Sequence, residues 1–183
     1  GAERKITGGD QELQGGIRLT MPDTGGMALL VHRLAEFAEA YPGIELELMP
    51  SYDALDLSRR EADIAIRIMP AGVAPPDYLI GRFLCRITAS SAVHRELLNP
   101  DRPEEVSHLS WIGKNSLGQD EKWVADTDFP KQPLRHSIVN VNLLVAAIQS
   151  RMGMVFMPCF MAHDQRDIVQ VPGARVVHQS DLW

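Results

Sequence analysis

Residues 17–26, read as I-R-L-T-M-P-D-T-G-G, carry the feature that most constrains the fold. An apolar stretch ends at Pro22, two good helix N-caps follow (Asp23 and Thr24), and a glycine pair leads into helically spaced apolar residues. This order predicts a strand that turns sharply into an amphipathic helix over residues 27–41. In open α/β sheets, small ligands bind at such strand ends, and the N–H groups of a helix start favour anions. Asp23 is better explained as a cap, because its carboxylate would repel an anion. Thr24 fits a cap and a ligand contact equally well.

The next stretch repeats this alternation of strand and helix. Residues 44–49, I-E-L-E-L-M, alternate perfectly and predict a strand, and residues 62–68 predict another by alternation and β-branching. A short helix is expected between them at residues 54–60. Strands that alternate with helices favour right-handed crossovers and a parallel sheet.

The second half of the chain predicts further short elements. We expect strands at residues 79–87, 110–112, 135–139, 154–158, 169–171 and 175–178. We expect helices at residues 92–98, after a turn at 88–91, and at 143–151, capped by Asn142 and followed by Gly153 as a stop, with one helical turn at 162–166.

Composition narrows the class of protein. A chain of 183 residues is long enough to bury a sizeable core. Its formal net charge of −6 argues against this segment gripping nucleic acid by itself, because binding to the phosphate backbone needs a basic face. Its two cysteines, Cys85 and Cys159, are far apart in apolar settings, and we interpret them as buried free thiols in a reducing compartment. The six histidines show no metal-ligand spacing, no nucleophile motif is present, and no apolar run is long enough to span a bilayer.

Arg67 is the most informative charged residue, because it lies near the carboxyl end of an apolar strand. A guanidinium there needs a partner, either a protein carboxylate or an anionic ligand. Ser51 ends the preceding strand, and Ser90 and Asn142 are expected to begin helices. Each of these three residues fits a cap, but their convergence on one cleft would favour binding.

Several segments, taken in order, resemble the effector-binding domain of LysR-type transcriptional regulators. They are G-I-R-L-T-M-P-D-T-G-G from residue 16, L-A-E-F-A-E-A-Y-P-G-I-E-L-E-L from residue 34, L-D-L-S-R-R-E-A-D-I-A-I-R from residue 55, and residues 79–92 and 140–159. The resemblance covers nearly the whole chain from Gly16. It implies the type 2 periplasmic binding protein fold, an α/β architecture of two Rossmann-like subdomains around a cleft, joined by two crossover strands.

The resemblance also implies a domain organisation. Residues 1–15 would be a linker remnant, residues 16–87 subdomain I, and residues 88–183 subdomain II with the start of the return crossover. The family's winged helix-turn-helix is absent, and we expect the last part of subdomain I to be missing. Ser91 stands where the family often has proline, so the second subdomain would begin differently.

The function implied by the resemblance is effector sensing rather than catalysis. A small, anionic metabolite, such as a carboxylate, would bind between the subdomains. The residues expected to contact it are Asp23, Thr24, Ser51, Arg67, Ser90, Asn142, Met157 and Pro158. No cofactor, metal or membrane is expected. The full-length protein would be a cytoplasmic homodimer or tetramer that contacts DNA only through the absent N-terminal domain. The helix at 27–41 and the strand at 44–49 are the candidate dimer surface, although core packing explains the same apolar stripe.

Two alternatives use the same fold. A periplasmic solute-binding protein of a transporter would have an apolar leader upstream, whereas a regulator would have a basic helix-turn-helix there. An enzyme such as a dehydratase would need an acid–base constellation, which the sequence does not show, although fold alone does not exclude one.

Overall fold

The computed structural model describes residues 13–22, 28–50, 62–114, 121–163 and 165–183. Contacts divide these residues into two compact units, which are described separately. The first unit comprises the described residues up to Ile66, and the second unit comprises the described residues from Arg67 to Trp183. The subdomain boundary expected after residue 87 stays a prediction.

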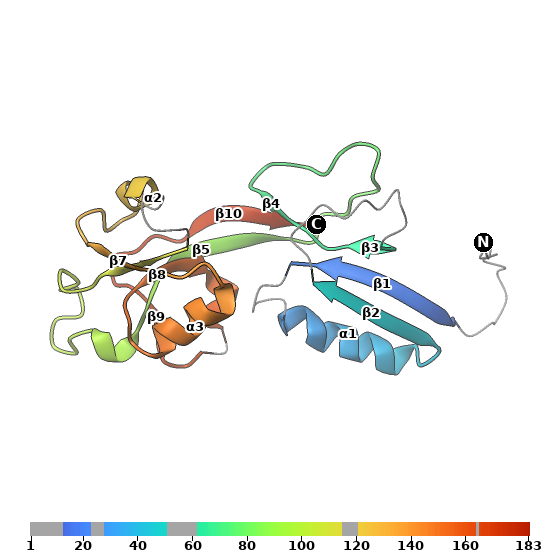
Figure 1. Cartoon of the computed structure of the whole chain (residues 1–183), viewed down its shortest axis with the longest axis horizontal. Coiled ribbons are helices and arrows are strands. Elements are labelled where there is room, and N and C mark those ends of the chain that lie inside the picture. Colours follow the sequence, from blue (N-terminus) through green and yellow to red (C-terminus); the bar gives the residue numbers. More distant parts are fainter. Residues whose placement is uncertain (1–12, 23–27, 51–61, 115–120, 164) are drawn as a thin grey trace. The chain divides into compact units, whose positions relative to one another are not determined.

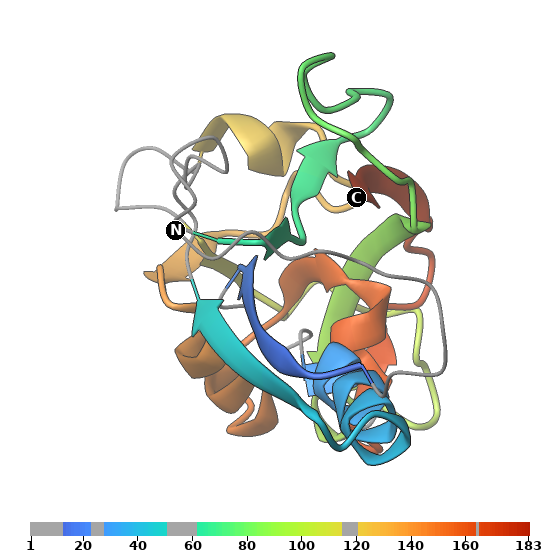
Figure 2. The same ribbon diagram turned by 90° about the vertical axis from the view of Figure 1, so that its right-hand side faces the viewer.

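The first unit is a parallel three-stranded sheet with one helix. Its elements are β1 (Gly15–Met21), α1 (Ala28–Ala40), β2 (Ile44–Pro50) and β3 (Ile64–Ala65), and the strand order is β2-β1-β3. The helix α1 lies along β1 and β2 (Figure 1 and Figure 2). The strands predicted at 17–22 and 44–49 and the helix predicted at 27–41 are therefore confirmed in type. The helix predicted at residues 54–60 lies outside the described residues.

The strand predicted over residues 62–68 is divided. Ile66 N donates to Thr20 O at 2.8 Å in the first unit, whereas Arg67 N donates to Trp183 O at 2.9 Å in the second. The chain thus leaves one sheet after Ile66 and enters another. Alternation alone predicts both pieces as extended but cannot show that their partners differ.

The second unit is built on a long central strand, β5 (Cys85–His94). Its sheet has the order β4-β10-β5-β8, and β9 pairs with the end of β5, all antiparallel. The flanking strands are β4 (Ile68–Pro70), β8 (Val155–Pro158), β9 (Ile168–Gln170) and β10 (Val177–Leu182). A parallel pair, β6 (Trp111–Gly113) and β7 (Leu134–Ser137), is linked to this sheet by a bridge between Trp111 and Met154. The helices are η3 (Arg95–Leu97), α2 (Glu121–Ala125), α3 (Val141–Gln149) and η4 (Cys159–Ala162).

The second unit has two apolar clusters, on opposite faces of its strands. Val155 and Met157 belong to the cluster around α3, and Met154 and Phe156 belong to the cluster around Trp111. Successive side chains of a strand point to opposite faces, so this alternation assigns one cluster to each face.

Several predicted boundaries in this unit are wrong. The strand predicted at 79–87, the turn at 88–91 and the helix at 92–98 are replaced by β5 over residues 85–94 and the short η3. The small polar residues of the supposed turn are held as strand because β10 and β8 supply backbone partners on both sides. The helical turn predicted at 162–166 lies earlier, as η4, and the last strand runs to Leu182. Cys85 is exposed and Cys159 half-buried, contrary to the expectation that both are buried.

Candidate functional site

A cavity of about 440 Å³ lies on the α3 face of the second unit, and we name it the α3-side cavity. Two of the predicted binding residues, Met157 and Pro158, line it. They close β8, where they pair with Ser90 and Ala89 of β5. The full lining is Ile68, Met69, Pro70, Ile87, Lys114, Val141, Leu144, Met157, Pro158, Met161, Gln179 and Ser180.

Arg67 immediately precedes the cavity residue Ile68. Its backbone is fixed by two hydrogen bonds with Trp183, in which each N–H donates to the other's carbonyl, at 2.9 and 3.0 Å. Partial burial lowers the pKa of the Arg67 guanidinium, because desolvation disfavours the charged form.

The structure corrects the roles expected for Ser90 and Asn142. Ser90 lies inside β5, not at a helix start, and its buried hydroxyl donates to Arg175 O at 2.9 Å. Asn142 is an exposed residue of the first turn of α3, and the N-cap is Asn140, whose Oδ1 accepts from Leu143 N at 3.0 Å. Asn140 and Asn142 both favour caps, and sequence alone did not discriminate between them.

Asp23, Thr24 and Ser51 lie outside the described residues. Of the eight residues predicted to bind ligand, the described structure thus brings Met157 and Pro158 to one cavity, with Arg67 and Asn142 each one residue from a cavity-lining position.

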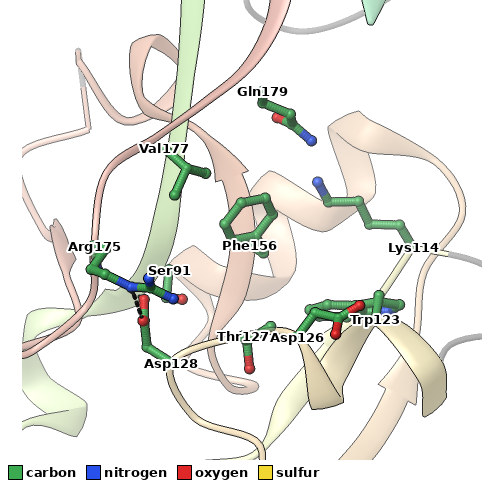
Figure 3. A pocket seen from close by; sticks show the side chains of 10 residues that line it. All are labelled: Ser91, Lys114, Trp123, Asp126, Thr127, Asp128, Phe156, Arg175, Val177 and Gln179. Atoms are coloured by element: carbon green, nitrogen blue, oxygen red, sulfur yellow. Dashed lines mark hydrogen bonds and ion pairs between the residues drawn. The ribbon is translucent and has the colours of Figure 1, made fainter. Parts of the chain in front are cut away.

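A second pocket, of about 390 Å³, lies in the same unit, and we name it the aromatic pocket. Its lining is Ser91, Lys114, Trp123, Asp126, Thr127, Asp128, Phe156, Arg175, Val177 and Gln179 (Figure 3). Lys114 Nζ is 5.7 Å from the centroid of the Phe156 ring, a cation–π arrangement. Trp123 stacks edge-to-face on the fully buried Trp111, with centroids 5.1 Å apart. Sequence reasoning missed this pocket, and its one signal was a tryptophan inside a polar stretch.

An ion pair between Arg175 and Asp128 fixes one side of the aromatic pocket. Arg175 N donates to Asp128 Oδ2 at 2.8 Å, and Arg175 Nε donates to Asp128 Oδ1 at 2.5 Å. The backbone hydrogen bond, and then the side-chain one, lower the pKa of the Asp128 carboxyl below its ordinary value. Asp128 is therefore an ionised carboxylate whose negative charge is balanced by Arg175.

Neither pocket has the chemistry of a metal centre. Within the part of the chain that the structure describes, no group of three or more His, Cys, Asp or Glu residues could hold a metal ion.

Among the helices in the described residues, none combines the length and the apolar character needed to cross a membrane.

Comparisons with known proteins agree on one family. The family model described as LysR substrate binding domain matches residues 10–183. An HTH-type transcriptional regulator of Xanthomonas campestris is 31% identical over 97 residues, which are 51% of this chain and 27% of the relative. The uncharacterized HTH-type transcriptional regulator YhjC of Escherichia coli is 30% identical over 116 residues, which are 58% of this chain and 38% of the relative. The chain thus corresponds to well under half of the length of these regulators.

Solved structures show the same fold at low sequence identity. The regulatory domain of CrgA from Neisseria meningitidis has a TM-score of 0.66 at 22% identity and covers 93% of this chain and 88% of its own. The full-length virulence activator AphB of Vibrio cholerae has a TM-score of 0.65 at 24% identity and covers 92% of this chain and 60% of its own. The effector domain of AmpR from Pseudomonas aeruginosa has a TM-score of 0.64 at 15% identity. The match covers 92% of this chain and 84% of the AmpR domain. The α/β type 2 periplasmic binding protein fold implied by the sequence is thereby confirmed.

Proposed function

The chain belongs to the LysR substrate-binding domain family, and from that premise we propose that its α3-side cavity takes part in binding a small anionic effector. The family is the effector-binding part of transcription regulators, so a transporter's solute-binding protein is not favoured. The observation that carries the proposal is the cavity itself. It brings the strand-end residues Met157 and Pro158 together with the ammonium-bearing Lys114.

The lining of the cavity suits a ligand with an apolar body and an acidic group. Ile68, Ile87 and Leu144 supply aliphatic surface, whereas Lys114 supplies a positive charge. Lys114 is a half-buried residue, and a positive charge in such a setting attracts a carboxylate more strongly than a fully exposed one, because screening by water is weaker. A carboxylate-bearing metabolite is therefore the proposed effector class.

Arg67 is proposed as the second cationic contact of this effector. Burial already disfavours its charge, and a bidentate carboxylate is the partner that best matches a guanidinium. Asp23, Thr24, Ser51, Ser90 and Asn142 stay proposed contributors. Ser90 would first have to release its bond to Arg175 O.

Calorimetry with a panel of organic acids tests the role of Arg67. A charge-assisted hydrogen bond contributes about 1.5–3 kcal/mol, so Arg67→Ala should weaken binding of the best acid roughly 10- to 100-fold. Arg102→Ala is the matched control, because it removes an exposed arginine whose one ion pair among the described residues is with Glu105. Equal affinity of the wild-type protein and Arg67→Ala would reject the role.

For the whole protein, we propose the organisation of a cytoplasmic regulator that is not an enzyme. Effector binding would favour one conformation of this domain over another, and a separate helix-turn-helix domain would carry the shift to DNA.

We also propose that the protein forms a homodimer or tetramer through α1 and the edge strand β2. Both expose apolar side chains there, Val31 on α1 and Leu48 on β2.

A further inference from the structure

We propose that the aromatic pocket is a second ligand site, for a small, flat aromatic molecule that bears an acidic group. This site is separate from the α3-side cavity of the proposed function. The inference rests on three observations: the ring surfaces of its walls, the position of one ammonium group, and a serine hydroxyl group in its lining.

The walls of the pocket present aromatic and aliphatic surface from different elements. Phe156 comes from β8, Val177 from β10 and Trp123 from α2, and their side chains surround one space (Figure 3). Trp123 is held by its edge-to-face contact with the core residue Trp111. Rings held in fixed orientations favour a flat aromatic guest, because little side-chain freedom is lost when it stacks.

The charges around the pocket favour an acidic group on one side. Lys114 Nζ lies over the Phe156 ring, on the same side as the Gln179 amide (Figure 3). Asp128 is already paired with Arg175, and Asp126 is solvent-exposed, where water and salt screen its repulsion. An acidic group beside Lys114 would therefore meet a positive charge and an amide donor.

Ser91 supplies a hydrogen-bonding group at the base of the pocket. Ser91 is 2% exposed and lines the pocket. A hydroxyl group can both donate and accept a hydrogen bond, so it can interact with a polar atom of a ligand. The ligand class is thus an aromatic acid with a second polar atom on the ring, such as an indole N–H.

The aromatic pocket and the α3-side cavity lie on opposite faces of β8. Phe156 faces the aromatic pocket together with its cross-strand partner Ser91, whereas Met157 lines the α3-side cavity. Lys114 and Gln179 line both spaces, so variants at these two residues do not separate the sites. Discriminating variants must fill one space only.

Indole-3-carboxylate is the probe for the test, with cyclohexanecarboxylate as a non-aromatic acid of similar charge. The three tryptophan indole N–H signals, of Trp111, Trp123 and Trp183, are followed by ¹⁵N–¹H NMR during titration. We expect indole-3-carboxylate to shift the Trp123 signal in a saturable manner. We expect cyclohexanecarboxylate to bind more weakly. Absence of a saturable Trp123 shift would overturn the proposal.

Two valine-to-phenylalanine variants assign the site. Val177→Phe fills the aromatic pocket from a residue that is 38% exposed, and Val141→Phe fills the α3-side cavity. Binding of indole-3-carboxylate should weaken at least roughly tenfold in Val177→Phe and stay within about twofold in Val141→Phe. The reverse result would overturn this proposal and place the probe in the α3-side cavity, in agreement with the proposed function.

A more conservative variant tests whether the Phe156 ring selects the ligand. Phe156→Leu keeps an apolar side chain but removes the ring beneath Lys114. We expect it to weaken indole-3-carboxylate several-fold and to leave cyclohexanecarboxylate unchanged. Equal weakening of both acids would show that the ring does not select the ligand. Unchanged Trp111 and Trp183 signals in each ligand-free variant establish that the fold is intact.

Discussion

At the scale of single residues, Asp181 holds two strands and a loop together. Its buried carboxylate accepts a hydrogen bond from Gly72 N at 2.9 Å and lies 2.7 Å from His178 Nε2. It belongs to β10, where it pairs with Met69 of β4 and Arg86 of β5. The hydrogen bond from Gly72, and then the His178 interactions, hold the pKa of Asp181 below its ordinary value of 3.8.

Asp181→Asn should therefore destabilise the protein in a pH-dependent way. A carboxyl whose pKa is lowered by folding stabilises above its unfolded pKa, and this contribution is lost as the pH falls through the folded value. The variant should have a lower free energy of unfolding than the wild type at pH 7, and the difference should shrink as the pH falls below about 4. Urea unfolding between pH 3 and 7 measures this. Asp77→Asn, at an exposed loop position, is the control, and a pH-independent difference would contradict the prediction.

The sequence could identify candidate binding residues only where they lie at the end of a strand that the sequence pattern predicts. Met157 and Pro158 close a buried apolar run, and both line a cavity. Lys114 and Trp123 were missed, because they become neighbours of Phe156 only when β6, α2 and β8 pack in one unit. Nothing local in the chain encodes that convergence.

At the scale of elements, regular alternation was a dependable guide and local turn propensity was not. The alternating residues 44–49 form β2 as predicted. The serine-containing residues 88–91 do not turn, since β10 and β8 supply backbone partners on the two sides of β5. Tertiary pairing outweighed the local preference of serine for turns and caps.

Two asparagines near the start of α3 test where this helix begins. Asn140→Ala removes the cap to Leu143 N and should lower the free energy of unfolding by about 1 kcal/mol. Asn142→Ala changes an exposed residue of the first turn, so its effect should stay within about 0.5 kcal/mol. Urea unfolding of both variants against the wild type measures the difference. A larger loss for Asn142→Ala would place the helix start where the sequence first suggested it.

At the scale of the whole molecule, the order of strands in the second unit differs from their order in the chain. β10 is the last strand in sequence, yet it lies between β4 and β5 in the sheet (Figure 1). β4 and β10 are separated by the rest of the unit, so their pairing closes a long loop and is expected to form late in folding. The sequence could not reveal this, because strand patterning shows which residues are extended and not which strands pair.

Removal of residues 177–183 should therefore abolish cooperative folding of the second unit. Without β10, β4 has no described strand partner and β5 loses one of its two paired edges, so unsatisfied backbone groups and the apolar residues beneath them become exposed. Removal of Trp183 alone is the matched control, since it takes away two hydrogen bonds with Arg67 and leaves β10 complete. Thermal unfolding followed by tryptophan fluorescence measures the effect. The control should unfold cooperatively at a lower temperature than the wild type. The longer deletion should show no cooperative transition in the fluorescence of Trp111 and Trp123. If the longer deletion unfolds as sharply as the control, β10 is an accessory strand, and the second unit is held together by the packing on the two faces of β5 and β8 instead.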